Sequence, residues 1–252
     1  MTEPSERIEY DEFSLFHENA SEFGIPYDGP PVVRREEVAV DADRNLSALV
    51  WGDTPAEIVF LHGGAQNAHT WDTVALALKR PLVCIDLPGH GHSDGGRSGS
   101  LDLASNAQDV ATVIRRLAPD AKAVVGMSLG GMTSLALAHA APDLVRKLVL
   151  VDITPGVNQE KSADIHAFIN GPESFPDFNE ILKRTIEFNP TRTESSLRRG
   201  ILHNAVQRDD GSWVWRYARF RATDAGPGDG GNVIEQAGAL WDLVSTLQMP
   251  LM

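Results

Sequence analysis

Short runs of apolar residues alternate with longer amphipathic stretches over much of this chain. Four of the runs are three to five residues long and lie at 58–61, 82–85, 123–125 and 147–151. A continuous apolar run of this length is typical of a strand that is buried on both faces of its sheet. We therefore expect four parallel strands with helices packed on both faces.

Three amphipathic stretches predict the helices of this core, at 71–78, 101–117 and 129–140. In the second stretch, apolar side chains recur at spacings of three and four, among them Leu103, Ala107, Val110 and Ile114. That period places them on one face of a helix.

The chain before the first parallel strand divides into two parts. Two β-rich segments, 32–40 and 45–51, flank Asp41-Ala42-Asp43-Arg44, which suits a tight turn, so we expect an antiparallel hairpin. The preceding residues are acidic, lack periodicity and end in Gly29-Pro30-Pro31. We expect residues 1–31 to be an N-terminal extension across the surface, with the folded core beginning after it.

The alternation of strands and helices stops after Pro155. Short amphipathic helices are expected at 162–169, 178–188 and 194–206. The aromatic run from Trp213 to Tyr217 and a glycine-rich stretch at 226–231 follow them. We expect residues 155–231 to form a helical lid, and the aromatic run to pack the lid or to line an acyl pocket.

A final helix is expected near residues 232–247, before the apolar tail Met249-Pro250-Leu251-Met252. The tail has no helix cap, so we expect another strand to begin there. The predicted core therefore consists of residues 32–154 and 232–252, with the lid between them.

Composition excludes several classes of function. Of 252 residues, 42% are hydrophobic and 23% are charged, which is near the globular average. The net charge of −13 disfavours nucleic acids and anionic lipid surfaces as partners. Cys84 is the only cysteine, and no segment resembles a membrane span or a secretory signal. We expect a cytoplasmic protein and leave its oligomeric state open.

The main chemical signal is Gly126-Met127-Ser128-Leu129-Gly130, between a predicted strand and a predicted helix. A serine on such a sharp turn presents its hydroxyl above the sheet, and glycines permit the close packing around it. The alternative is an ordinary glycine-rich turn. The motif in this setting favours Ser128 as a nucleophile.

A second signal is the turn His62-Gly63-Gly64 after the first parallel strand. Attack on an ester carbonyl places negative charge on oxygen, which preorganised backbone amides stabilise. We expect the amides of Gly64 and Leu129 to form this oxyanion hole, the latter aided by the helix dipole. The alternative is that this turn is only a flexible connection after the strand and has no chemical role.

These two turns, the loop from Asp86 to Asp94 and the strand ending at Asp152 resemble the α/β-hydrolase superfamily, in particular its lidded esterase-like members. The resemblance covers residues 32–152 well and the lid loosely. It implies a doubly wound, mostly parallel sheet with a lid and a Ser-acid-His triad. It also implies a serine hydrolase that cleaves a small or medium carboxylic ester through an acyl-enzyme on Ser128, without a cofactor.

The triad is incomplete in this sequence. A serine becomes nucleophilic when an imidazole removes its proton, and a carboxylate orients the imidazole. The family places the histidine last, but only His166 and His203 follow Asp152, and both fall in the predicted lid. We hypothesise that the C-terminal strands and the catalytic histidine are absent from the sequence; a lid histidine is the alternative.

Asp152 is a candidate for the triad acid because it ends a strand that should neighbour the strand of Ser128. A later carboxylate is the other possibility, and Asp152 could instead only cap the turn at Thr154-Pro155.

Two further alternatives concern metals and the reaction class. The loop that contains His90 and His92 offers ligand types, but it matches the structural loop of the family and four convergent ligands are not evident, so we expect no metal. Serine at position 128 disfavours family members with a carboxylate nucleophile. Carbon–carbon bond hydrolysis and a non-catalytic, ligand-binding homologue remain alternatives.

Overall fold

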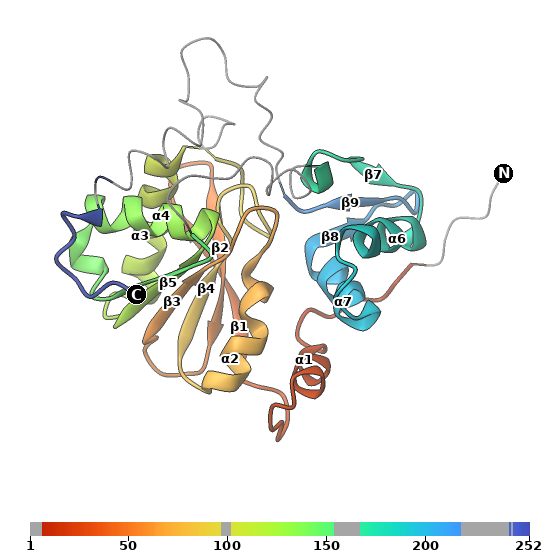
Figure 1. The fold of residues 1–252 in the computed structure, drawn as a ribbon, viewed down its shortest axis with the longest axis horizontal. Helices are drawn as coiled ribbons and strands as arrows, with labels where there is room; N and C mark the ends of the chain where they lie inside the picture. The colour runs from red at the N-terminus through yellow and green to blue at the C-terminus, as the bar shows by residue number, and fades with distance from the viewer. Residues whose placement is uncertain (1–6, 97–101, 154–166, 218–241, 243) are drawn as a thin grey trace, which may run out of the picture.

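The computed structural model describes residues 7–96, 102–153, 167–217, 242 and 244–252. Its main sheet has six strands in the order β1-β2-β4-β3-β5-β6 (Figure 1). The strands are β1 (Val33–Ala39), β2 (Asn45–Trp51), β3 (Ile58–Leu61), β4 (Leu82–Ile85), β5 (Ala123–Met127) and β6 (Leu148–Val151).

Strand directions in the main sheet match the sequence prediction. β1 and β2 form an antiparallel hairpin, and β2 also pairs antiparallel with β4. The neighbouring strands β4, β3, β5 and β6 are all parallel. The predicted α/β fold with four parallel strands is therefore confirmed.

Helices cover both faces of this sheet because side chains alternate along the strands. In β4, Val83 and Ile85 pack with α3 (Leu103–Leu117) and α4 (Leu129–Ala140). Leu82 and Cys84 face the other way, toward the short helix η1 (Ala68–Trp71) and α2 (Asp72–Leu78). A second short helix, η2 (Pro142–Leu144), follows α4. No helix in the described part of the chain is long and apolar enough to cross a membrane.

The expectation that packing begins only after residue 31 is wrong. The extension contains α1 (Phe16–Glu22), and Phe16 is only 1% exposed. Its ring lies against Trp51 of β2, with 4.9 Å between ring centroids. Burying an aromatic side chain stabilises a fold strongly, so α1 is part of the core on this face of the sheet.

Residues 167–217 form a small unit beside the main sheet (Figure 1). It contains α6 (Phe178–Phe188), α7 (Glu194–Asn204) and an antiparallel sheet of β7 (Ser174–Phe175), β9 (Trp213–Trp215) and β8 (Ala205–Gln207). Its own core includes Ile181, Ile201 and Trp213.

The predicted helical lid therefore needs correction, because the small unit has a sheet as well as helices. The helix expected at 178–188 is confirmed, but the one expected at 194–206 ends at Asn204 and continues as a strand. Trp213-Val214-Trp215 is also a strand, as alternating aromatic and branched residues favour. Most of the helix expected at 162–169 and the glycine-rich stretch lie outside the described residues.

The apolar tail lies beside β6. Leu148 donates a hydrogen bond to the carbonyl of Pro250 (3.0 Å) and Leu150 donates one to that of Met252 (2.8 Å). The pairing is parallel. It agrees with the expectation that a strand begins near Met249, whereas most of the helix expected at 232–247 lies outside the described residues.

Candidate active site

Ser128 occupies a strained turn at the carboxyl end of β5. Its backbone has φ +48° and ψ −114°, and the next residue, Leu129, begins α4. A positive φ is rare for a residue other than glycine and costs about 1–3 kcal/mol, which the surrounding packing must support. The residue is exposed, so the turn presents serine at the edge of the sheet.

Two glycines of the motif make this turn possible. A Cβ atom on Gly130 would lie 2.4 Å from the carbonyl oxygen of Leu61, and one on Gly126 would lie 2.5 Å from the carbonyl oxygen of Gly130. Both distances are far below van der Waals contact. The backbones of β3, β5 and α4 can therefore approach only because these positions carry no side chain.

The turn after β3 lies next to Ser128. A Cβ atom on Gly63 would lie 3.5 Å from the Cβ of Ser128, and one on Gly64 would lie 4.0 Å from a methyl group of Leu129. Within the described residues, the amides of Gly64 and Leu129 donate no hydrogen bond. The two amides assigned to the oxyanion hole are thus near the serine, and their role stays a prediction.

The histidine of this turn has a structural role. His62 is fully buried; its Nδ1 donates to the carbonyl of Gly63 (2.7 Å), and its Nε2 accepts from the amide of Leu87 (3.0 Å). Burial also lowers the pKa of its imidazole. A neutral ring with both nitrogens engaged holds the turn and is not available as a base.

The loop from Asp86 to Asp94 is likewise held by its own polar groups. The carboxylate of Asp86 accepts hydrogen bonds from the amides of Ala68 (2.6 Å) and His92 (3.0 Å) and from the guanidinium of Arg35 (2.8 Å). His90 is bonded to the carbonyl of Pro88, and burial lowers its pKa to about 3. These side chains orient the loop, as the sequence suggested.

Asp152 follows the strand adjacent to that of Ser128. Met127 and Val151 are paired across β5 and β6, and the amide of Ser128 donates to the carbonyl of Val151 (3.0 Å). Asp152 is exposed and has φ +54°. The carboxylate therefore belongs to the same edge of the sheet as the serine, while its role as triad acid stays a prediction.

No hydrogen bond joins a histidine to Ser128 or Asp152 among the residues that the structure describes. His166 lies outside those residues. His203 is buried, and its Nδ1 is bonded to the hydroxyl of Tyr10 at 2.6 Å. The contacts of His203 thus lie elsewhere, and the imidazole of the triad is not identified.

A cavity of about 820 Å³ lies between the main sheet and the small unit. Its lining includes Gly64 and Gln66 from the turn after β3, and Phe188 and Trp215 from the small unit. Ligand pockets of this size with aromatic walls are typical of sites for small molecules. Trp215 therefore belongs to the pocket wall, whereas Trp213 belongs to the core of the small unit.

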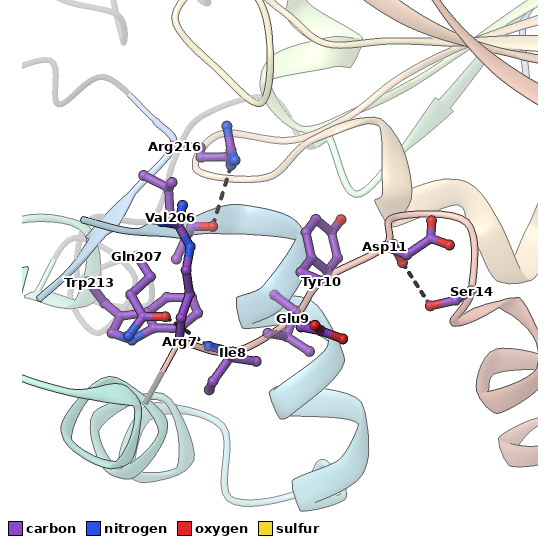
Figure 2. Close-up of a pocket in the computed structure, with 12 residues that line it drawn as sticks. Arg7, Ile8, Glu9, Tyr10, Asp11, Ser14, Val206, Gln207, Trp213 and Arg216 are labelled. Atoms are coloured by element: carbon purple, nitrogen blue, oxygen red, sulfur yellow. Dashed lines mark hydrogen bonds between the residues drawn. The ribbon is translucent and has the colours of Figure 1, made fainter. Parts of the chain in front are cut away.

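A second cavity, of about 680 Å³, lies between the N-terminal segment and the small unit (Figure 2). Here the amide of Ile8 donates to Gln207 (3.0 Å), and the hydroxyl of Ser14 donates to the carbonyl of Asp11 (2.8 Å). No histidine is among the residues that line this cavity, so we do not place the expected ester hydrolysis there.

Sequence analysis missed a buried cluster on the wall of the larger cavity. His69, Asp72 and His203 converge, with 3.8 Å between the two imidazole centroids, and the two histidines line this cavity. Burial alone would lower the pKa of His69, but Asp72 and Glu12 raise it to about 9. In the sequence, only the spacing of three residues between His69 and Asp72 could have indicated this cluster, because His203 lies far along the chain in the small unit.

Comparison with known proteins identifies relatives of the chain. Residues 57–239 match the family described as alpha/beta hydrolase fold. The chain is 43% identical over its whole length to esterase Rv0045c of Mycobacterium tuberculosis, and the match covers 80% of that protein. It is also 32% identical over 127 residues to 2-(acetamidomethylene)succinate hydrolase of Mesorhizobium japonicum, covering 49% of this chain and 45% of that enzyme.

A solved structure of the Mycobacterium tuberculosis esterase, from work on its inhibition by transition metals, has a similar fold. It aligns with a TM-score of 0.80 and covers 96% of this chain and 80% of the esterase chain. The similarity therefore extends over the small unit and the main sheet together.

Proposed function

The chain belongs to the α/β-hydrolase family, and on that premise we propose that it is a carboxylic ester hydrolase whose nucleophile is Ser128. The 43% identity to a named esterase over the whole chain supports the reaction class. The observation that carries the assignment of the nucleophile is the strained and exposed turn of Ser128 beside the unpaired amides of Gly64 and Leu129.

In the proposed reaction, the hydroxyl oxygen of Ser128 attacks the carbonyl carbon of the ester while an imidazole takes the hydroxyl proton. The carbonyl electron pair moves onto oxygen, which accepts hydrogen bonds from the amides of Gly64 and Leu129. One such donor contributes about 2.7–4 kcal/mol to transition-state stabilisation. Collapse of the intermediate expels the alcohol, which receives the proton, and leaves an acyl group on Ser128.

Hydrolysis of the acyl-enzyme repeats these steps with water as the nucleophile. The imidazole removes a proton from water, and the tetrahedral intermediate forms in the same oxyanion hole. Its collapse releases the carboxylic acid, and the Ser128 oxygen takes back the proton from the imidazolium. We assign the carboxylate that orients the imidazole to Asp152, since it ends the strand next to that of Ser128. A carboxylate elsewhere in the chain is the alternative.

The proposed substrate is a small or medium ester. The cavity of about 820 Å³ extends from Gly64 to the aromatic side chains Phe188 and Trp215. An acyl chain in contact with these rings would place its carbonyl oxygen toward the Gly64 amide. We propose that the small unit acts as the lid of this pocket and that its side chains select the acyl group.

The test compares the full chain with its Ser128→Ala variant. We expect wild type to react with a fluorophosphonate probe and to hydrolyse short-chain nitrophenyl esters, and Ser128→Ala to lose both activities. Ser14→Ala, which changes an exposed serine outside the site, is the matched control and should retain both. Equal labelling and turnover in Ser128→Ala would remove the nucleophile assignment, and inactivity of all three proteins would favour a ligand-binding homologue.

A further inference from the structure

The cluster of His69, Asp72 and His203 has the composition and spacing of a metal site. His69 lies in η1, Asp72 begins α2 and His203 lies in the last turn of α7. One potential ligand atom from each residue lies within 4.8 Å of the other two. All three side chains are at least nine-tenths buried, with exposed fractions of 3%, 1% and 6%.

Two polar atoms of this cluster are buried without a hydrogen-bond partner, Asp72 Oδ1 and His203 Nε2. Such unsatisfied groups are costly, and native structures rarely keep them. They belong to neighbouring residues that both offer ligand atoms. A cation bound between them would satisfy both at once.

The distances suit two nitrogens and one carboxylate oxygen around a single ion. Asp72 Oδ2 lies 2.8 Å from His69 Nδ1 and 3.9 Å from His203 Nε2. Because Zn²⁺ binds nitrogen and oxygen at about 2.0–2.2 Å, two ligands of one ion lie at most about 4.2 Å apart. Both pairs fall within that limit. Because the two imidazoles are stacked, with 3.8 Å between their centroids and 14° between their planes, one ring must rotate for both nitrogens to point at one ion, which would also displace the proton shared by His69 Nδ1 and Asp72.

The outer nitrogen of each imidazole already has a partner. His69 Nε2 lies 3.2 Å from a carboxylate oxygen of Glu12, and His203 Nδ1 lies 2.6 Å from the hydroxyl of Tyr10. Figure 2 shows Tyr10 on the N-terminal segment beside the small unit. Metal-binding histidines characteristically donate their other ring N–H to such a group, which fixes the orientation of the ring.

We propose that His69, Asp72 and His203 bind one transition metal ion of the Zn²⁺ type, through His69 Nδ1, His203 Nε2 and the Asp72 carboxylate. This donor set is one that Zn²⁺ prefers. Three protein ligands leave a position for water. His69 and His203 line the larger cavity, so an ion can reach the site from there.

The bound ion would join three parts of the molecule. His69 and Asp72 belong to the main domain, His203 belongs to the small unit, and Tyr10 and Glu12 belong to the N-terminal segment. Since a ligand that binds only the folded state stabilises it, added Zn²⁺ should raise the Tm of the protein.

The test is titration of the metal-free full chain with ZnCl₂ by isothermal titration calorimetry. We expect one Zn²⁺ per chain in wild type and a dissociation constant at least ten-fold higher in His203→Gln and in Asp72→Asn. His139→Gln, which changes an exposed histidine at the end of α4, is the matched control and should keep the wild-type affinity. The readout needs no ester and is independent of the proposed function.

Tyr10→Phe keeps the three ligands and the aromatic ring but removes the group that orients His203. We expect a ten-fold to hundred-fold loss of affinity, as for other such partners of metal-binding histidines. Wild-type affinity in His203→Gln, or binding of less than one ion to wild type, would overturn the proposal. If His203→Gln and Asp72→Asn fail to fold, unchanged affinity in Tyr10→Phe would overturn it as well.

Discussion

At the scale of single residues, the chain accepts backbone strain where the proposed chemistry occurs. Ser128 and Asp152 both have positive φ, and both lie at the ends of adjacent parallel strands. The hydrogen bond from the Ser128 amide to Val151 connects the two turns. Strain of this kind persists only where the surroundings enforce it, and here the enforcing contacts are those around Gly126 and Gly130.

Gly130→Ala should therefore destabilise the protein. Its new methyl group would meet the backbone carbonyl groups of Leu61 and His62 at 2.4 and 2.5 Å. We expect the free energy of unfolding, measured by urea denaturation, to fall by about 1–3 kcal/mol. Gly200→Ala is the control, because no atom beyond its chain neighbours and the adjacent backbone of α7 lies within 4 Å of the new methyl group. An exposed helical glycine replaced by alanine should gain about 0.5–1 kcal/mol, and equal losses in both variants would contradict this account.

Asp152→Asn tests the proposed triad acid. An amide has the size of the carboxylate but cannot stabilise an imidazolium, and the corresponding change in a known serine triad lowers kcat by about 10⁴. We expect a loss of at least about 10² in kcat for nitrophenyl ester hydrolysis. Asp143→Asn, at an exposed position in η2, should retain wild-type kcat. Near-wild-type turnover in Asp152→Asn would assign the acid to another residue.

Local motifs explain why part of the site was predictable. The turns at Ser128 and Gly64 are each encoded by consecutive residues, so sequence alone located them. The cluster of His69, Asp72 and His203 was not predictable, since His203 meets His69 only after the small unit packs against the main sheet. The prediction that the chain has no metal rested on the loop with His90 and His92, and it did not consider this cluster.

At the scale of elements, the N-terminal helix α1 differs most from the sequence prediction. It has only seven residues, so its apolar positions form no extended pattern, and its partner Trp51 lies on β2. The parallel strands, by contrast, were predictable because each is a continuous apolar run. The aromatic run that contains β9 was expected to pack a helical lid or to line an acyl pocket, and its alternating Trp-Val-Trp sequence forms a strand instead of a helix.

Phe16→Ala measures the contribution of α1 to the core. Removing this buried ring should lower the free energy of unfolding by about 3–5 kcal/mol, from lost burial and the cavity left behind. The control is Phe23→Ala at the end of the same helix, where the side chain is 60% exposed. We expect a change within about 0.5 kcal/mol for that variant. Similar small effects in both would show that α1 is not part of the core.

An ion pair connects α1 to α7 and should make stability depend on pH. Glu22 lies 2.5 Å from Arg199, and although burial opposes it, the hydrogen bond from Arg199 lowers the pKa of Glu22 below its usual 4.5. The unfolded chain thus binds a proton at higher pH than the folded one. The stabilisation is complete above pH 4.5 and is lost as pH falls through the lowered pKa of the folded state.

The measurement is urea denaturation of wild type and Glu22→Gln between pH 7 and pH 3. Because Glu22 is exposed and solvent screens the pair, we expect wild type to be more stable by about 0.2–1 kcal/mol at pH 7, with the difference shrinking below about pH 4.5. A difference that stays constant over this range would exclude the ionised Glu22 as its cause.

At the scale of the whole molecule, three parts of the chain enclose one cavity. The turn after β3 contributes Gly64, α1 contributes Asn19 and Glu22, and the small unit contributes Phe188 and Trp215. The sequence predicted a core with an inserted unit, and the resemblance to a family predicted that Ser128 and Asp152 follow neighbouring strands at one edge of the sheet. The contact of the N-terminal segment with the small unit depends on long-range packing, which periodicity does not encode.

Mapping the covalent intermediate would identify the nucleophile of the proposed reaction directly. The full chain is mixed briefly with a nitrophenyl ester, quenched in acid, digested and analysed by mass spectrometry. We expect the acyl group to be attached to the peptide that contains Ser128 and this adduct to be absent from Ser128→Ala. Ester hydrolysis with the acyl group on another residue, or with unchanged turnover in Ser128→Ala, would contradict it.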